Sequence, residues 1–333
     1  MLDHAAELIQ SGALVGIPTE TVYGLGADAL NPEAVRSIFE AKGRPGDNPL
    51  IVHIAETAEL MPLISVEPSE NARKLMEAFW PGPLTLIFPK SEKVPMCTTG
   101  GLNTVAVRMP SHPVARELIR RSGLSIAAPS GNRSGRPSPT TAAHMFEDMD
   151  GRIDLIIDGG ESDVGVESTV VDMTGEIPRI LRPGGVTPEQ IREICGDCIV
   201  DSAVMRPLKE NEAPRSPGMK YRHYAPAGQL TIFRGDSARV VEEICATYDQ
   251  ALSEGRRPLI LSLAENIPAY GNRRLESLGR DASEMAHAIF AVLRDADHLH
   301  ADVILSEGVE TEGIGLAVMN RLGRAAAFHI VEL

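Results

Sequence analysis

The chain has 333 residues, of which 43% are hydrophobic, and its formal net charge is −14. This length allows two domains that each bury a core, and the acidic balance argues against tight binding of long polyanions such as tRNA. No apolar run is long enough to cross a membrane, the N-terminus carries no basic apolar leader, and the four cysteines are too scattered for a disulfide framework. The sequence therefore predicts a globular protein of the cytoplasm.

The N-terminal segment predicts a short amphipathic helix over residues 2–10 and a strand over residues 13–18 that is apolar enough to be buried on both faces. The polar residues 19–21 follow this strand, where an open α/β sheet commonly places its site. The two glycines of GLG at residues 24–26 are expected to allow tight backbone turns. The third glycine of a dinucleotide-binding fingerprint is missing there.

A cationic loop follows the next predicted helix, which begins at an Asn-Pro pair and is expected to end at Gly43. Lys42 and Arg44 flank this glycine in the stretch KGRPGDNPLIVHI, and two prolines on either side of Asn48 stiffen the loop. We expect both cations on an exposed loop. Either cation alone could simply be solvated, but a pair on a stiff loop favours a site that binds anions.

Two polar residues lie inside predicted strands. His53 is near the end of an apolar strand, where a core role and a site role are about equally supported. Arg108 lies within TVAVRMP, and if that strand is central its charge is there to bind an anion. Ser130 and Asn132 follow the next strand in SGNRSGRPSPT and offer donors of the kind that hold carboxylates and phosphates.

The last part of the first 200 residues has a predicted strand opened by Ser168 and another ended by Arg182. Cys195 and Cys198 form a single CxxC pair without a second pair or a nearby histidine, so a structural role is favoured over a metal or redox role. The sequence contains no GxxxxGK[ST] motif, so any nucleotide binding is not of the P-loop kind.

Residues 201–229 form an irregular segment with five basic and three acidic residues in an otherwise acidic chain. A plain interdomain linker is one interpretation, but its KYRHY cluster can stack on a base and neutralise phosphate. We therefore hypothesise a lid over the active site. Regular alternation of strands and helices resumes after it, and the GIG before the last helix is expected to serve close packing. The predicted parts are residues 1–200, a linker over 201–229, and a second domain without chemistry over 230–333.

Seven segments together resemble one protein family: PTETVYGLGADA, KGRPGDNPLIVHI, TVAVRMP, APSGNRSGRPSPT, ESTVVD, LRPGG and SPGMKYRHYAP. Along its whole length the chain resembles the long form of the L-threonylcarbamoyladenylate synthases. The resemblance implies a YrdC-like α/β catalytic domain, with a twisted mixed sheet and flanking helices, and a smaller C-terminal Rossmann-like α/β domain. It also implies a nucleotidyltransferase that converts L-threonine, bicarbonate and ATP to threonylcarbamoyl-AMP and pyrophosphate, the first step toward threonylcarbamoyladenosine in tRNA.

The same resemblance assigns roles to individual residues. It implies catalytic roles for Lys42 and Arg44 and a threonine site made of Thr21, His53, Arg108, Ala128 and Ser168. It implies ATP binding by Arg44, Asn48, Thr104, Ser130, Asn132, Ser138, Arg182, Arg222, His223 and Tyr224. Mg²⁺ is expected to be held through the ATP phosphates, without metal ligands from the protein or an organic cofactor. The product is expected to pass to a downstream tRNA-modifying threonylcarbamoyl transferase complex.

Two other functions stay open from the sequence. A YrdC-like domain with a basic concave face could be an RNA-binding module, although the net charge of −14 argues against strong binding of a long polyanion. A carbamoyl transferase that uses carbamoyl phosphate is the other alternative. The acylphosphatase-like and zinc-finger segments of such proteins are missing from this sequence.

Overall fold

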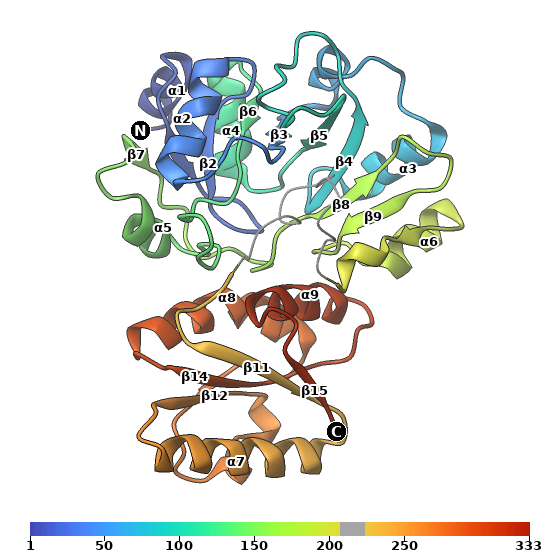
Figure 1. The fold of residues 1–333 in the computed structure, drawn as a ribbon. Coiled ribbons are helices and arrows are strands. Elements are labelled where there is room, and N and C mark those ends of the chain that lie inside the picture. Colours follow the sequence, from blue (N-terminus) through green and yellow to red (C-terminus); the bar gives the residue numbers. More distant parts are fainter. Residues whose placement is uncertain (207–223) are drawn as a thin grey trace. The chain divides into compact units, whose positions relative to one another are not determined.

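The computed structural model of the chain describes residues 1–206 and 224–333 (Figure 1). Arg222, His223 and most of the predicted lid lie outside the described residues. The described residues form two compact units, one made of Met1–Ser134 and Ser138–Val204, the other of residues 224–333 with Gly135–Pro137 and residues 205–206. In the described part of the chain, no helix combines the length and the apolar character that crossing a bilayer requires.

The first unit is built on a mixed sheet. Within its described residues the strand order is β10-β9-β8-β4-β5-β3-β6-β2-β1-β7. Parallel neighbours such as β3 and β5 occur beside antiparallel neighbours such as β4 and β5, which confirms the predicted mixed α/β sheet. The strands are β1 Val15–Ile17, β2 Gly24–Asp28, β3 Ile51–His53, β4 Leu84–Pro89, β5 Thr104–Arg108, β6 Ile126–Ala127, β7 Leu155–Ile156, β8 Thr169–Asp172, β9 Arg179–Arg182 and β10 Ile199–Val200.

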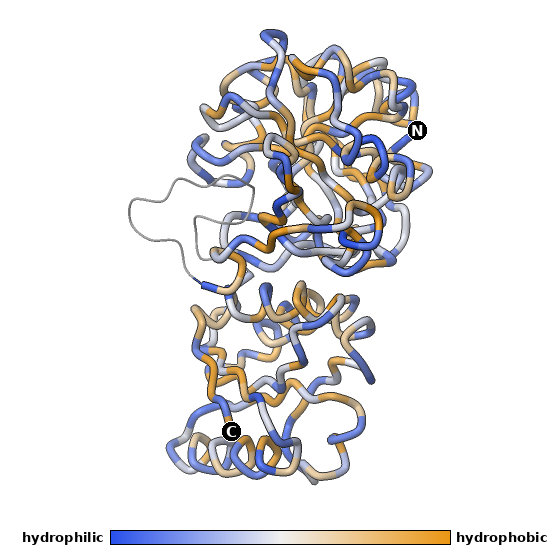
Figure 2. The backbone as a smooth tube through the Cα atoms, turned by 90° about the vertical axis from the view of Figure 1, so that its right-hand side faces the viewer, coloured by the Kyte–Doolittle hydropathy of each residue, from blue (hydrophilic) through white to orange (hydrophobic). Residues whose placement is uncertain are grey.

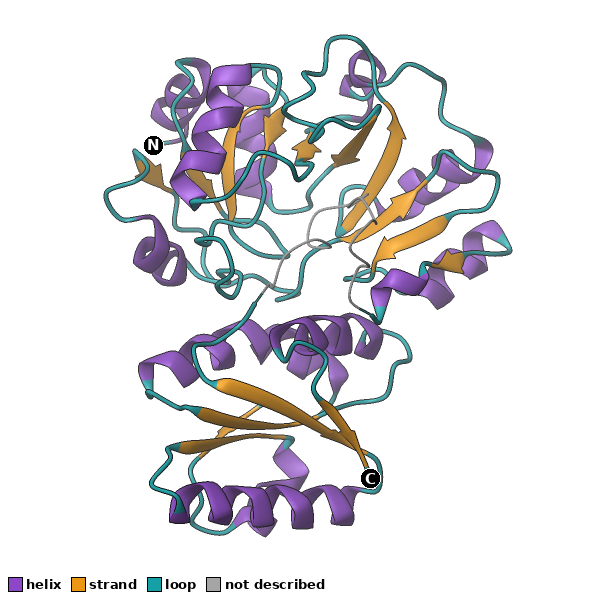
Figure 3. Cartoon of the chain, in the orientation of Figure 1, coloured by secondary structure: helices purple, strands orange, loops and turns teal. Residues whose placement is uncertain are grey.

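Helices cover both faces of this sheet (Figure 3). Helices α1 and α4 pack together and share one hydrophobic cluster with Ile126, whereas α2, α3, α5 and α6 contribute to a larger cluster that contains Ala127. These two neighbours in β6 join different clusters because successive residues of a strand point to opposite faces. The helices are α1 Leu2–Gln10, α2 Pro32–Lys42, α3 Glu70–Phe79, α4 Pro113–Ser122, α5 Ala142–Met149 and α6 Pro188–Cys195, with 3-10 turns η1 Thr57–Glu59, η2 Met61–Leu63 and η3 Ser202–Val204.

The ends of the predicted helices follow from local chemistry. The Asn31 side chain accepts hydrogen bonds from the first backbone N–H groups of α2, and Gly43 ends this helix in the left-handed region, with φ of 63°. Thr187 and Gln190 form a reciprocal capping box at the start of α6. The predicted starts of both helices and the predicted end of α2 are confirmed.

The prediction that Gly24 and Gly26 form tight turns was wrong. Both lie inside β2, which pairs antiparallel with β1, and neither has a positive φ. A Cβ atom on Gly26 would lie 2.2 Å from Cδ1 of Ile17. The glycine is required here by the close approach of the side chains of β1, and not by a turn.

The second unit is a parallel α/β sandwich with strand order β13-β12-β14-β11-β15. Helix α7 packs on one face of this sheet, while α8 and α9 pack together on the other (Figure 1). In Figure 2 the tube of α7, the lowest helix of the view, alternates between hydrophilic and hydrophobic residues, as expected for a helix with one buried face. Its elements are β11 Gln229–Arg234, α7 Ser237–Ser253, β12 Pro258–Ser262, η4 Ala264–Tyr270, β13 Leu275–Ser277, α8 Ala282–His298, β14 Val303–Glu307, α9 Gly315–Ala325 and β15 Ile330–Glu332.

The glycine that begins α9 serves close packing, as predicted. A Cβ atom on Gly315 would lie 2.1 Å from the carbonyl oxygen of Glu310. No larger residue fits at this position without displacing the backbone of the preceding loop.

Candidate active site

Three polar side chains form a row across the middle of the first sheet. His53 of β3 lies opposite Arg108 of β5, and Arg108 lies opposite Thr85 of β4. Residues directly opposite each other in a ladder point to the same face, so the three side chains share one face of the sheet. All three are buried, with relative exposures of 4%, 4% and 0%. The strand of Arg108 is therefore central, as the predicted anion-binding role requires.

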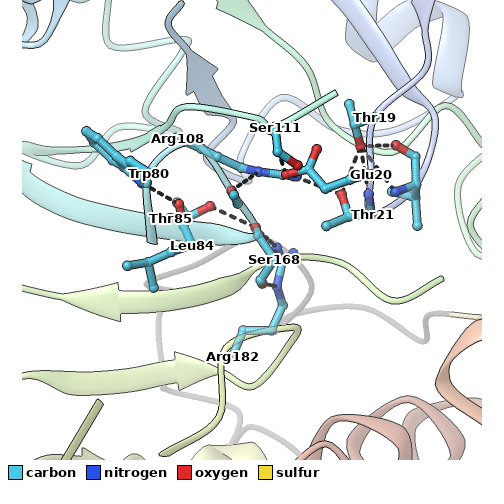
Figure 4. Close-up of polar contacts among 12 residues, drawn as sticks. Thr19, Glu20, Thr21, Trp80, Leu84, Thr85, Arg108, Ser111, Ser168 and Arg182 are labelled. Atoms are coloured by element: carbon cyan, nitrogen blue, oxygen red, sulfur yellow. Dashed lines mark hydrogen bonds and ion pairs between the residues drawn. The ribbon is translucent and has the colours of Figure 1, made fainter. Parts of the chain in front are cut away.

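Arg108 is held by the loop that follows β1 (Figure 4). Its Nη1 donates to Oγ1 of Thr21 at 2.9 Å and its Nε donates to the carbonyl oxygen of Gly82 at 3.2 Å. Its Nη2 lies 2.7 Å from Oε1 of Glu20, and the same oxygen accepts a hydrogen bond from the backbone N–H of Ser111 at 3.0 Å. The Nη2–Oε1 contact is an ion pair between two buried side chains of opposite charge.

The charge states of this cluster follow from burial and from Arg108. Burial alone would raise the pKa of Glu20, but the positive charge of Arg108 and the N–H of Ser111 outweigh it and hold this pKa below its usual value. Burial, with the charge of Arg108, lowers the pKa of His53 to about 3. Glu20 is thus ionised and His53 neutral near pH 7.

Ser168 links the row to the neighbouring strands. Its Oγ lies 2.7 Å from Oγ1 of Thr85 and accepts a hydrogen bond from Nη2 of Arg182 at 3.1 Å. Nε and Nη2 of Arg182 also donate to the carbonyl oxygen of Ser168, at 3.1 and 3.0 Å. Two predicted site residues, Ser168 and Arg182, are therefore in direct contact.

Ala128 lies just beyond β6 and lines a narrow cavity with Thr19 and His53. The remaining lining residues are apolar apart from the backbone: Ile17, Pro110, Ala115, Ile119 and Ile126. The structure thus brings Ala128 close to the predicted threonine residues. Its polar side chains are a hydroxyl and an imidazole, and its free space is about that of one water molecule.

The placement of Lys42 differs from the prediction of an exposed loop. Lys42 lies in the last turn of α2 and is only 3% exposed, whereas Arg44, beyond Gly43, is half-buried. The prediction failed because the helix ends at the glycine, so its last residue still faces the interior. Nζ of Lys42 donates to the carbonyl oxygen of Ser130 and, at 2.7 Å, to that of Asn132.

The charge of Lys42 is weakened by its surroundings. Burial, together with the charge of Arg44, lowers the pKa of Lys42 to about 7, against the opposing effect of Asp148 and Glu167. An amine with this pKa is only partly protonated near pH 7. An anionic ligand next to Lys42 would raise its pKa again, so that Lys42 becomes more fully charged when the ligand binds.

Asn48 is the most informative residue of the predicted ATP-binding set. Its side chain is fully buried, and neither its Oδ1 nor its Nδ2 has a hydrogen-bond partner among the described residues. A buried amide without partners costs about 1–3 kcal/mol for each missing group. The described residues do not recover this cost, which agrees with a binding role for Asn48.

The other predicted ATP-binding residues are spread over several elements. Ser138 is buried and donates to Oε1 of Glu167 at 2.7 Å, and Thr104 is half-buried at the start of β5. Tyr224 belongs to the second unit, where its ring lies 5.0 Å from that of Phe290. A role of Tyr224 at the ATP site stays a prediction.

The sequence interpretation assigned no role to three residues of this neighbourhood. Glu20 was placed at the expected edge of the site, but its ion pair with Arg108 was not foreseen. Thr85 is a polar residue inside the apolar strand LTLIFP, and that contrast was a usable signal. Glu167 directly precedes Ser168, but its contact with Ser138 joins residues 29 positions apart and has no local signature.

Comparison with known proteins decides the family. Residues 7–184 match a family model described as "Telomere recombination", and residues 186–327 match the model "Threonylcarbamoyl-AMP synthase, C-terminal domain". The chain belongs to the threonylcarbamoyl-AMP synthase family.

Relatives from distant organisms support this membership. Threonylcarbamoyl-AMP synthases of Pyrococcus abyssi and Bacillus subtilis are each 48% identical over 332 residues, which span 99% of this chain and 95% and 94% of those proteins. The enzyme of Schizosaccharomyces pombe is 40% identical over 98% of this chain and 88% of its own length. These names confirm the predicted enzyme class and favour it over an RNA-binding module or a carbamoyl-phosphate-dependent transferase.

Solved structures give the same answer for the fold. The crystal structure of Pyrococcus abyssi Sua5 complexed with L-threonine has a TM-score of 0.95 and 48% identity, with 100% of this chain and 96% of that chain covered. A double alanine variant of the same protein also has a TM-score of 0.95, at 47% identity, with 100% and 94% covered. The predicted fold class, a mixed α/β catalytic domain with a smaller C-terminal α/β domain, is confirmed.

Proposed function

We propose that the chain makes threonylcarbamoyl-AMP and pyrophosphate from L-threonine, bicarbonate and ATP, with the first sheet as the catalytic centre. The observation that carries the proposal is the buried row of His53, Arg108 and Thr85, held beside Thr21 and Ser168. This row offers a guanidinium, an imidazole and hydroxyls within one face, the set that a small hydroxylated amino acid needs. A relative that is 48% identical carries L-threonine in its crystal structure.

The threonine site consists of residues that this structure already brings together. Arg108 binds the carboxylate of threonine through charge-assisted hydrogen bonds, with Thr21 beside it. Neutral His53 and the hydroxyl of Ser168 serve the polar groups of the substrate, and Ala128 leaves room for its methyl group.

The proposed nucleotide site draws its residues from several elements of the first unit. Its residues are cations and neutral donors, which suit phosphate oxygens: Lys42, Arg44, Asn48, Thr104, Ser130, Asn132, Ser138 and Arg182. The set contains no carboxylate of its own and Glu167 beside it is engaged by Ser138, so we propose that Mg²⁺ is held through the ATP phosphates. Such an ion would neutralise phosphate charge during the transfer. By the same resemblance, Arg222, His223 and Tyr224 are also proposed to bind ATP.

The reaction requires the protein mainly to position the substrates and to neutralise their negative charge. The amine of threonine bonds to the carbon of bicarbonate-derived CO₂ and loses a proton, and an oxygen of the resulting carbamate then attacks the α-phosphorus of ATP, from which pyrophosphate leaves. When protonated, Lys42 uses two of its three N–H donors for the carbonyl groups of Ser130 and Asn132, which leaves one for a phosphate or carbamate oxygen. Fixed donors of this kind stabilise developing charge without reorganisation.

We place the reaction in the cytoplasm, where the labile product passes to a threonylcarbamoyl transferase complex that modifies tRNA. The decisive test is pyrophosphate release by the purified protein, with each of the three substrates omitted in turn and the adenylate identified by mass spectrometry. Release that needs threonine, bicarbonate and ATP together is expected. Equal release without threonine or without bicarbonate would overturn the proposal.

A further inference from the structure

We propose that Glu20 is a substrate-positioning residue that accepts the α-amino N–H of threonine, next to Arg108, which binds the α-carboxylate. This inference rests on the proposed function and extends it to a residue that the predicted site did not include. It explains why a carboxylate is buried in a site that must bind anions.

The two oxygens of Glu20 differ in their contacts. Oε1 forms the ion pair with Arg108 at 2.7 Å and accepts the N–H of Ser111 at 3.0 Å. Oε2 is buried and has no hydrogen-bond partner among the described residues. A buried carboxylate oxygen without a donor is costly, so the described protein leaves one acceptor of Glu20 for a ligand.

The loop around Glu20 is fixed from both sides. Oγ1 of Thr19 donates to the carbonyl oxygen of Val22 at 2.6 Å and accepts the N–H of Thr21 at 3.2 Å. The carbonyl oxygen of Glu20 accepts the N–H of Val164 at 2.8 Å. A carboxylate on such a braced loop is already in position before a ligand arrives, which lowers the entropy cost of binding.

The charges of Glu20 and Arg108 are complementary to the amine and the carboxylate of an amino acid. The amine and the carboxylate of threonine are attached to the same carbon, so a carboxylate and a guanidinium in contact present complementary charges at a similar spacing. A lone Arg108 would bind any small carboxylate, whereas Glu20 repels acids that lack an amine. Glu20 thus adds selection for α-amino acids over hydroxy acids.

Glu20 holds the amine and does not remove its proton. The charge of Arg108 keeps the pKa of Glu20 low, so it is a weak base. A carboxylate that stays ionised accepts an N–H from the free amino acid and from the carbamate alike. The substrate therefore keeps one contact while its nitrogen bonds to CO₂.

The test compares two ligands, L-threonine and (R)-β-hydroxybutyrate, which has the same carboxylate, hydroxyl and methyl group but no amine. Their affinities are measured by calorimetry or ligand-observed NMR on the full chain and on Glu20→Gln. Loss of a charged contact predicts about tenfold weaker threonine binding or more, with hydroxybutyrate bound equally well or better. If both ligands weaken by the same factor, Glu20 only supports Arg108 and the inference is wrong.

Two further variants keep the test decisive. Glu20→Asp retains the charge beside Arg108 but withdraws the oxygens by one methylene, so it should also weaken threonine binding selectively. This variant serves as the test if Glu20→Gln folds poorly. Glu56→Gln removes an exposed carboxylate that pairs with Arg116 and Arg120, and it should change neither affinity. Wild-type protein that fails to bind threonine would refute the proposed function itself, whereas an unchanged ligand preference in Glu20→Asp and Glu20→Gln would refute only the role of Glu20.

Discussion

Glu20 of the first unit and Glu307 of the second are both buried near a sheet, and they differ in how completely they are bonded. In the second unit Glu307 ends β14, and both of its oxygens are satisfied: Oε1 accepts from Ser262 and Tyr270 at 2.9 and 2.8 Å, and Oε2 accepts from Asn266 at 2.8 Å. In the first unit one oxygen of Glu20 has no partner among the described residues. The buried side-chain amide of Asn48 also has no hydrogen-bond partner among the described residues.

The contrast separates a structural network from a binding site. A complete set of neutral donors stabilises the Glu307 carboxylate within the protein alone, and burial with the nearby Glu307 charge raises the pKa of Tyr270 so that its O–H stays a donor. A set that is incomplete among the described residues leaves a cost that a ligand or an ordered water can remove. The difference favours chemistry in the first unit and a supporting role for the second.

The largest effect is expected for Lys42→Ala. This change removes the donors that hold the carbonyl groups of Ser130 and Asn132 and removes a charge from the nucleotide site. Contacts from a charged group contribute about 1.5–3 kcal/mol each, so adenylate formation should fall about 100-fold or more. The rate of pyrophosphate release at saturating substrate concentrations measures this loss of activity.

Lys90→Ala is the matched control for this variant. Lys90 also donates to two backbone carbonyls, those of Ser91 and Val94, but it is not among the proposed site residues. Near-normal turnover in Lys90→Ala is expected. If both variants lose activity equally, the loss reflects the fold, and Lys42 has no special part in catalysis.

A smaller and more selective effect is expected for Arg108→Lys. Lysine keeps the charge next to Glu20 but cannot present two parallel donors, so threonine affinity should fall by about 1–3 kcal/mol while ATP affinity changes little. Separate calorimetric titrations of the two ligands measure both values. Equal weakening of both would show that Arg108 supports the sheet or the phosphates instead.

The smallest effect on activity is expected for Glu307→Leu, which leaves the donors of Ser262, Asn266 and Tyr270 without their acceptor. The free energy of unfolding of the second unit should fall by about 3 kcal/mol. Hydrogen exchange should accelerate in peptides of β12 and β14, with threonine affinity unchanged. The exposed Glu265→Ala in the same unit is the control, and weaker threonine binding in Glu307→Leu would remove the proposed distinction between the two glutamates.

Sequence patterns predicted most elements because their signals are local. An asparagine cap, a terminal glycine or an apolar run depends on a few neighbouring residues, and the elements at α2, β5 and α6 followed these rules. Strand β2 was missed because its glycines normally mark turns, and their use for close packing against Ile17 depends on the neighbouring strand.

The candidate site was predictable only in part for the same reason. Arg108 stood out as a charge within an apolar strand, and the structure places it in the centre of the sheet. The contacts of Glu20 with Arg108 and of Thr85 with Ser168 join residues more than 80 positions apart. Such pairs depend on which strands are neighbours and in which register, information that one sequence does not carry.

The row of Thr85, Arg108 and His53 also fixes the width of the candidate site. Its members stand on three adjacent strands, so the distance between its ends is set by backbone hydrogen bonding at about 10 Å, or two strand spacings. Insertions in the connecting loops leave this distance unchanged. A shift of one residue in the register of a strand turns its member of the row to the opposite face of the sheet. Substrate size at this site can therefore change through exchanged side chains, but not through the gradual lengthening of loops.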